Sequence, residues 1–148
     1  MKSLFKRWFK AQSKPRSIVL RHQGRHFNLK EIYDRVNERY FANELQLHIT
    51  WFGTGKMDYR RRVMLGSFHR HHKLIKINRV LDQADTPPFY VEFIVYHEML
   101  HHVLPPIIER RKRFIHHTAF KEREKQFHDY ALAREYRTQN KLKWFDNA

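Results

Sequence analysis

Residues 88–104 read PFYVEFIVYHEMLHHVL, a mostly apolar stretch that contains the motif H-E-x-x-H at residues 97–101. Its apolar residues recur every three or four positions, and prolines stand at both of its ends, so we predict a helix over residues 88–104. On a helix, residues i and i+4 lie on one face. His97 and His101 can therefore bind the same metal ion.

The motif assigns a separate role to Glu98. In zinc hydrolases of this pattern, the two histidines bind the metal and the glutamate beside them handles the protons of the attacking water. The prediction is that Glu98 is the catalytic base and that His97 and His101 are metal ligands. The alternative is a buried helix whose histidines belong to the core and bind nothing.

A third metal ligand must follow His101 in the chain, because a catalytic zinc site usually has three protein ligands and an open fourth position. His102 points roughly 100° away from His101 around the helix, so it is a poor candidate. The candidates considered in the C-terminal part are His116, His117, Glu122, Glu124 and His128. The residue pattern alone leaves these alternatives open.

The chain of 148 residues has no cysteine. This excludes disulfide bonds, a cysteine-based zinc ribbon and a thiol nucleophile, and it fits a reducing compartment. No apolar run approaches the roughly 18–20 residues that span a bilayer. The basic N-terminus has no apolar segment typical of a secretory signal. We therefore expect a cytoplasmic protein, associated with the nucleoid if it binds DNA.

The net charge of +15 is unevenly distributed, since residues 1–30 hold nine Lys and Arg and no acidic residue. We predict a basic N-terminal arm over residues 1–27, followed by one domain over residues 28–148. Aromatic residues alternate with cations in the first ten positions of the arm. Such a strip suits a nucleic acid or, less well, an anionic membrane surface, and a solvated tail is the alternative.

Two further basic clusters lie within the predicted domain. Phosphate contacts made by Lys and Arg are independent of sequence and depend on salt. The candidate contacts to nucleic acid are Arg60, Arg61, Arg62, Arg110, Arg111, Lys112 and Arg113. The alternative is an ordinary solvated basic surface.

The remaining elements are predicted from periodicity. Asn28 is a suitable N-cap for a helix over residues 29–41. Strands are expected over residues 45–51, 63–68 and 74–77, and one long helix is expected to begin near Thr118. The predicted fold class is α+β, with a small antiparallel sheet packed on helices.

Three short motifs in order resemble the SprT-like (Spartan-type) zinc metalloproteases. They are Asn37-Glu38-Arg39-Tyr40-Phe41, the H-E-x-x-H run at residues 97–101, and His116-His117-Thr118-Ala119-Phe120. The resemblance covers roughly residues 28–132. It implies a zincin-like core of the minimal gluzincin type, one Zn²⁺ ion, and a third ligand at His116, which a shift of one position would exchange for His117.

The resemblance also implies an activity, the zinc-dependent hydrolysis of peptide bonds, with family links to DNA–protein crosslink repair. We therefore expect a metalloprotease that acts on nucleic-acid-associated proteins. Tyr96 and His117 are candidates for a second group that polarises the substrate carbonyl. A non-enzymatic DNA- or RNA-binding protein with a structural or absent metal is the alternative function. The chain lacks the Cys-rich zinc ribbon that some relatives carry.

Overall fold

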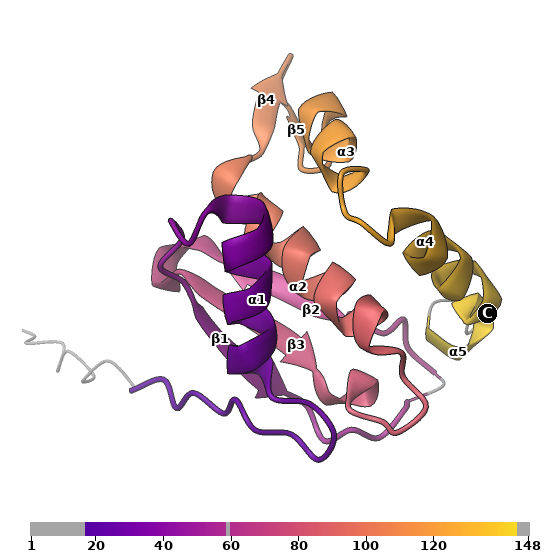
Figure 1. Ribbon diagram of the computed structural model, residues 1–148. Helices are drawn as coiled ribbons and strands as arrows, with labels where there is room; N and C mark the ends of the chain where they lie inside the picture. The colour runs from indigo at the N-terminus through magenta and orange to yellow at the C-terminus, as the bar shows by residue number, and fades with distance from the viewer. Residues whose placement is uncertain (1–16, 59, 145–148) are drawn as a thin grey trace, which may run out of the picture.

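The computed structural model describes residues 17–58 and 60–144. It contains both helices and small sheets, which confirms the predicted α+β class (Figure 1). The helices are α1 (Leu29–Phe41), α2 (Pro88–Val103), α3 (Thr118–Glu124), α4 (Tyr130–Gln139) and α5 (Lys141–Trp144), and short 3₁₀ turns cover Arg70–His72 and Arg79–Leu81. The strands are β1 (His48–Phe52), β2 (Gly66–His69), β3 (Leu74–Asn78), β4 (Ile107–Glu109) and β5 (Lys112–Phe114).

Helix α1 begins and ends where the sequence predicts. The Asn28 side chain accepts hydrogen bonds from the backbone N–H groups of Lys30 and Glu31, as an N-cap does. Ala42 ends the helix in the left-handed conformation, with φ 51°. Local capping chemistry therefore fixes both ends of this helix.

The main sheet differs from the predicted antiparallel sheet, because one of its two strand pairs is parallel. Its strand order is β1-β3-β2, and β3 pairs with β1 in parallel and with β2 antiparallel. Residues 53–65 form a long connection between β1 and β2. The two strands do not pair with each other, and β3 lies between them. The central place suits β3 because Ile75 and Ile77 are both fully buried. The strand β2 is left at an edge.

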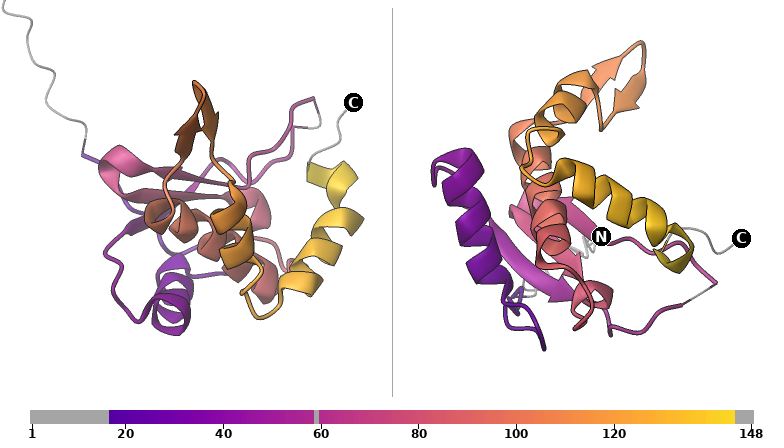
Figure 2. Two further views of the ribbon diagram at one scale, coloured as in Figure 1. Left: turned by 90° about the horizontal axis from the view of Figure 1, so that it is seen from above. Right: turned by 45° about the vertical axis from the view of Figure 1, so that its right-hand side comes forward.

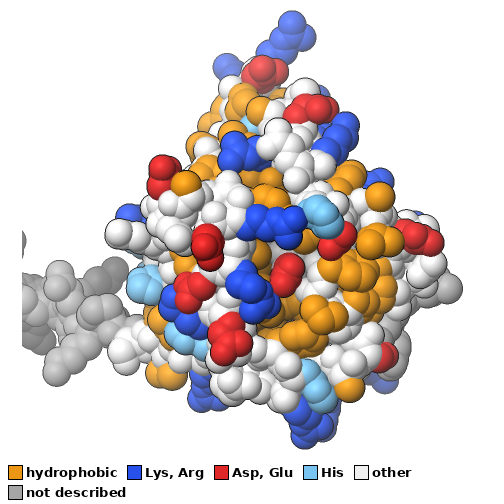
Figure 3. All heavy atoms as spheres, in the orientation of Figure 1, with side chains coloured by type: hydrophobic (Ala, Val, Ile, Leu, Met, Phe, Trp, Pro, Cys, Tyr) orange, Lys and Arg blue, Asp and Glu red, His pale blue; other side chains and the backbone are white. Residues whose placement is uncertain are grey.

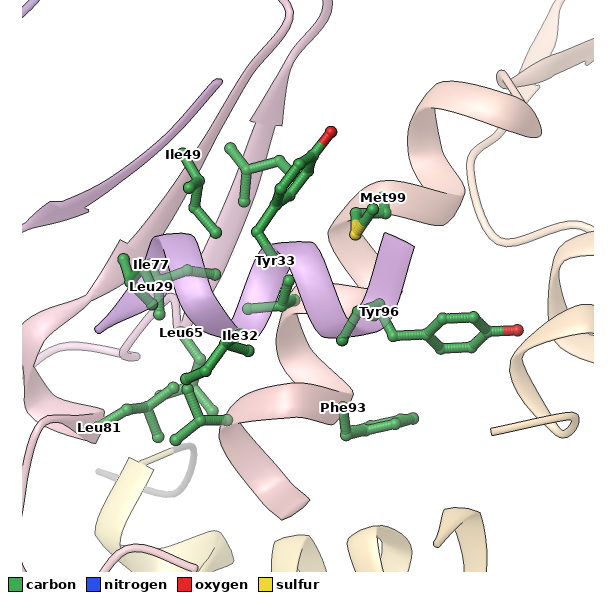
Figure 4. Close-up of a cluster of buried hydrophobic side chains, with 14 of the residues drawn as sticks. Leu29, Ile32, Tyr33, Ile49, Leu65, Ile77, Leu81, Phe93, Tyr96 and Met99 are labelled. Atoms are coloured by element: carbon green, nitrogen blue, oxygen red, sulfur yellow. The ribbon is translucent and has the colours of Figure 1, made fainter. Parts of the chain in front are cut away.

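Helices α1 and α2 cover the same face of this sheet, and α4 packs against α2 (Figures 1 and 2). The core lies between the two helices and the sheet. Ile49 and Ile77 of the sheet belong to the same buried cluster as Leu29 and Ile32 of α1 (Figure 4). Helix α2 thus lies at the middle of the molecule, where packing on several sides holds it firmly.

The C-terminal region is more divided than the sequence predicts. The expected single helix from Thr118 is two helices, because Phe127 turns into the core between α3 and α4 and is 3% exposed. The expected basic connection before His116 is a hairpin, β4–β5. Its turn residues Arg110 and Arg111 have φ values of 47° and 64°. Periodicity misses both features, since a buried kink and a short exposed hairpin leave little pattern.

The N-terminal segment packs on the domain from Arg21 onward. The backbone of Arg21 bonds to Thr50 and Trp51 of β1, and the Trp51 indole donates to the carbonyl of His22. The predicted boundary at residue 27 falls inside this packed segment. Residues 1–16, which carry the alternating aromatic and basic side chains, lie outside the described residues.

One buried carboxylate holds this segment in place. Asp82 accepts hydrogen bonds from the backbone N–H groups of Arg25, His26 and Phe27, at 2.5, 2.8 and 3.1 Å. We expect Asp82→Ala to lower the free energy of unfolding by about 2 kcal/mol, because three donors lose a charged acceptor. Urea unfolding of this variant beside Asp34→Ala, whose carboxylate is exposed on α1, measures the effect. Equal stability of the two variants would contradict this role for Asp82.

Candidate metal centre

The structure brings three histidines from two parts of the chain together. His97 and His101 lie one turn apart on α2, and His116 lies between β5 and α3. The Nε2 atom of His97 is 3.2 Å from the Nε2 atoms of both His101 and His116, and the other two Nε2 atoms are 3.3 Å apart. These three nitrogens form a nearly equilateral triangle.

The triangle has the size that a tetrahedral metal site requires. Zinc–nitrogen distances of about 2.0–2.1 Å place the ligand atoms of a tetrahedron about 3.3 Å apart. The distances between the three Nε2 atoms agree with this value. The cluster formed by His97, His101 and His116 can therefore hold a metal ion.

The protonation of the cluster also suits a metal. Burial, with the charges of His97 and His116 acting in the same direction, lowers the pKa of His101 to about 3. Burial and the charge of His97 also lower the pKa of His116. Both imidazoles are therefore neutral at pH 7, which is the form that binds metals.

Glu124 orients His97. Its Oε2 atom lies 2.5 Å from Nδ1 of His97, so Nδ1–H donates to the carboxylate and the Nε2 side of the ring faces the other two histidines. Burial acts to raise the pKa of Glu124, but the hydrogen bond from His97 and the nearby positive charges hold it below its ordinary value. A carboxylate behind a metal-binding histidine fixes its tautomer and its orientation. Glu124, a candidate ligand on sequence, is thus the partner of a ligand.

His117 does not join the cluster. Its Nδ1 atom accepts from the backbone N–H of Phe120 and caps α3, and its Nε2 atom lies 3.1 Å from the carbonyl oxygen of Pro105. The other candidates also point elsewhere. Glu122 pairs with Lys125, and His128 pairs with Asp129. Of the candidate third ligands, the structure brings His116 to the two histidines of α2.

Tyr96 is also engaged elsewhere. It is fully buried, and its hydroxyl donates to the carbonyl of Arg123 at 2.6 Å. Burial raises the pKa of Tyr96 to about 12. This hydroxyl joins α2 to the end of α3, so Tyr96, like His117, holds the structure together. Neither side chain is placed as the expected second group on a substrate carbonyl.

Glu98 and His97 both line a cleft of about 370 Å³. Glu98 is 5% exposed, and burial raises its pKa from 4.5 to about 7 although the charge of His97 acts in the opposite direction. A carboxyl group with a pKa near neutrality both accepts and donates a proton readily. The lining of the cleft is Arg62, Val63, Met64, Leu65, Gly66, Tyr90, Phe93, Ile94, His97, Glu98 and Arg137.

Gly66 on β2 makes room for Glu98. A Cβ atom at this position would lie 2.8 Å from Oε1 of Glu98 and 3.0 Å from Cγ2 of Ile94. Only a residue without a side chain lets the edge strand approach α2 so closely at this point. The sequence shows Gly66 inside a predicted strand, a position at which glycine often marks such an approach.

We expect Gly66→Ala to push β2 away from α2 and to lower the free energy of unfolding by about 1–3 kcal/mol. The reason is steric, since both neighbouring atoms belong to side chains that are held in α2. Denaturant unfolding, with Ser67→Ala on the same strand as the control, measures the loss. If Gly66→Ala left the free energy of unfolding unchanged, β2 and α2 would be able to move apart at this point without cost.

The predicted nucleic-acid contacts fall into two separate groups. Arg60, Arg61 and Arg62 lie in the connection before β2, and residues 110–113 form the tip and the second strand of the β4–β5 hairpin. Figure 3 shows Lys and Arg side chains at the outer end of this hairpin, with hydrophobic side chains toward its base. All of these cations are exposed.

No protein-family model matches the chain, and no curated protein and no solved structure is significantly similar to it. The resemblance to SprT-like proteases therefore stays a prediction. Within residues 17–58 and 60–144, no helix is both long and apolar enough to cross a bilayer.

Proposed function

We propose that this protein is a zinc-dependent metallopeptidase of the SprT-like type. The observation that carries the proposal is the meeting of three imidazole Nε2 atoms, one of which belongs to His97, a residue that lines an open cleft together with the buried Glu98. Each part has a known use in hydrolysis, because three neutral histidines leave one position of a tetrahedral metal open for chemistry. The adjacent glutamate supplies a base.

Zinc is the metal that the donor set favours. Three histidine nitrogens at tetrahedral spacing, without cysteine, suit zinc better than magnesium or calcium, which prefer oxygen ligands. Bound there, zinc would act as a Lewis acid that polarises a peptide carbonyl and makes water more acidic. His97, His101 and His116 would hold the ion, and Glu124 keeps His97 in the correct tautomer.

Glu98 performs the proton transfers in the proposed reaction. In its carboxylate form it accepts a proton from the water that attacks the scissile carbonyl carbon, and the peptide C–N bond then breaks. Glu98 donates the same proton to the nitrogen of the leaving amine, so it ends in its starting form. In the metal-free protein, burial raises the pKa of Glu98 to about 7.

A polypeptide suits this cleft because the strand β2, which has an unpaired edge, reaches the cleft at Gly66. Strand β2 pairs with β3 on one side, and among the described strands none pairs with its other side. Gly66 at the start of β2 lines the cleft next to Glu98. An extended peptide can add to such an edge through backbone hydrogen bonds, which places its carbonyl groups close to the base.

The test is hydrolysis of an unfolded protein, such as denatured casein, by the zinc-loaded chain. We expect cleavage that a chelator such as 1,10-phenanthroline stops and that added zinc restores. Cleavage that persists after the metal is removed would point to a contaminating protease. The absence of cleavage of casein and of shorter unstructured peptides by a protein shown to carry zinc would count against the proposal.

Nucleic-acid binding is the second candidate function, and the exposed cations of the β4–β5 hairpin favour it. If these residues contact phosphates, log affinity for DNA falls steeply with log salt, and replacing Arg110 and Arg111 by Gln flattens the slope. An affinity that hardly responds to salt would reject this function. Both functions together describe a protease that acts on proteins bound to nucleic acid.

A further inference from the structure

Helix α2, which carries His97 and His101, is followed by two residues that cannot cap it. Its C-cap is Leu104, and the next two residues are prolines. In the common C-terminal cap, the backbone N–H groups of the two residues after the C-cap donate to the carbonyls of the second-last and third-last helical residues. Proline has no backbone N–H. The carbonyls of His101 and His102, which stand at these two positions of α2, therefore lose their usual donors.

Arg70 supplies donors to these carbonyls from another part of the chain. It opens the short 3₁₀ turn that follows β2. Its Nη2 atom donates to the carbonyl of His101, and its Nη1 atom lies at a longer 3.5 Å from the carbonyl oxygen of His102. One guanidinium can serve both carbonyls because its N–H groups point in fixed directions from one plane.

Aromatic rings hold Arg70 in this position although its side chain is exposed. Its Cζ atom lies 5.4 Å from the centroid of the Phe68 ring, within the range of a cation–π contact. The ring of Phe68 in turn meets the ring of His102 edge-on, with the two centroids 5.8 Å apart. Phe68 belongs to β2 and His102 to α2, so these contacts join the edge strand to the end of the helix.

One of the two capped carbonyls belongs to a candidate metal ligand, His101. The Nε2 atom of this residue lies 3.2 Å from that of His97 and 3.3 Å from that of His116. His97 stands one turn earlier in the helix, where the helix itself supplies a donor for each carbonyl. The carbonyl of His101 falls in the last turn, which has no such donor of its own. The place of the His101 imidazole therefore depends on how well this last turn is held.

We propose that Arg70 is a positioning residue of the metal centre. By capping α2 it fixes the main chain of His101 and thereby the distance from this imidazole to those of His97 and His116. Glu124 orients His97 through its ring, and Arg70 supports a different ligand through its backbone. The inference rests on the part of the proposed function that assigns zinc to this centre, and it does not require peptide hydrolysis.

The test is the dissociation constant for zinc, measured by competition with a chelator of known affinity. We expect Arg70→Gln to weaken zinc binding about tenfold, the lower end of the range for residues that support a metal ligand. Arg70→Lys should weaken it less, because an ammonium group keeps the charge and can still reach one of the two carbonyls. Zinc bound by Arg70→Gln as tightly as by the wild type would overturn the inference.

Lys73→Gln is the matched control for charge. Burial lowers the pKa of His102, and the charges of Arg70 and Lys73 act in the same direction, so both cations lie near this end of α2. Lys73 closes the same 3₁₀ turn that Arg70 opens. We expect Lys73→Gln to leave the zinc dissociation constant unchanged. A loss of affinity as large as that of Arg70→Gln would assign the effect to charge and overturn the positioning role.

Urea unfolding with and without zinc separates positioning from a purely structural role. A cap that only stabilises the fold would lower the free energy of unfolding equally in both conditions, because the zinc dissociation constant would not change. The proposed role requires Arg70→Gln to lose more stability in saturating zinc than in a chelator. A tenfold change in the dissociation constant corresponds to a difference of about 1.4 kcal/mol. Equal losses in the two conditions would reject the proposal.

The outcomes also distinguish this inference from the proposed function. If the wild type and Arg70→Gln bind zinc equally well and the wild type cleaves peptides, the positioning role is rejected and the peptidase stands. If Arg70→Gln binds zinc more weakly but the zinc-loaded wild type cleaves nothing, the positioning role stands and the peptidase is rejected. A wild type that binds no zinc would overturn both.

Discussion

The His116→Ala variant is expected to purify without zinc, whereas the His117→Ala variant keeps about one zinc ion per chain. Two adjacent histidines thus receive opposite predictions. The Nε2 atom of His116 completes the triangle with His97 and His101, while His117 caps α3 and lies against Pro105. Loss of one of three ligands removes most of the affinity for the metal.

Without zinc, His117→Ala should be the less stable of the two variants, although it is the one that keeps the metal. His117→Ala removes the N-cap of α3 and is expected to cost about 1 kcal/mol. His116→Ala removes an exposed side chain that contacts His97, His101 and the ring of Phe120 but caps no helix, so its metal-free stability should stay close to that of the wild type. Elemental analysis gives the zinc content, and urea unfolding in a chelator gives the stability.

His97→Ala, which also removes a predicted ligand, is the positive control for zinc loss. Zinc retained by His116→Ala and lost by His117→Ala would exchange the roles of the two histidines and contradict the geometry. Zinc retained by both variants would mean that two histidines of α2 and a group outside the cluster bind the metal.

The amino-acid sequence predicts the parts of the site that local periodicity controls. The spacing of His97, Glu98 and His101 on one helix follows from the motif. The structure places His97 and Glu98 in the lining of a cleft, and the Nε2 atom of His101 lies 3.2 Å from that of His97. The third histidine follows from a resemblance between short motifs, and chain geometry then decides between two neighbours. That decision depends on the cap of α3, which no periodic pattern reveals.

The features that the sequence does not predict depend on contacts between residues far apart in the chain. The parallel pairing of β1 with β3 depends on how the connection over residues 53–65 crosses the sheet, and Gly66 matters because β2 reaches Glu98 there. Glu124 stands one helical turn after Phe120, a spacing that brings it toward the metal helix, yet its contact with His97 appears only in the folded chain. Each of these features joins residues distant in sequence.

The Glu98→Gln variant is expected to bind zinc as the wild type does and to hydrolyse peptides about 10²–10⁴ times more slowly, the range for loss of a positioned general base. Glutamine has nearly the shape of glutamate, so Gly66 and Ile94 accommodate it without displacement. It cannot accept a proton from water at neutral pH. Initial rates on a fluorogenic peptide, with zinc content measured on the same sample, provide the comparison.

The pKa of Glu98 supplies a control against misfolding. In the metal-free protein burial raises it from 4.5 to about 7, so the folded state holds this proton more tightly than the unfolded state does. The contribution of Glu98 to stability is then fully present below pH 4.5, falls as the pH rises, and is lost above about pH 7. Glutamine never ionises, so metal-free Glu98→Gln should be at least as stable as the wild type at pH 8. An inactive variant that is also unstable at pH 8 would attribute the lost activity to folding, and a fully active variant would remove Glu98 from the reaction.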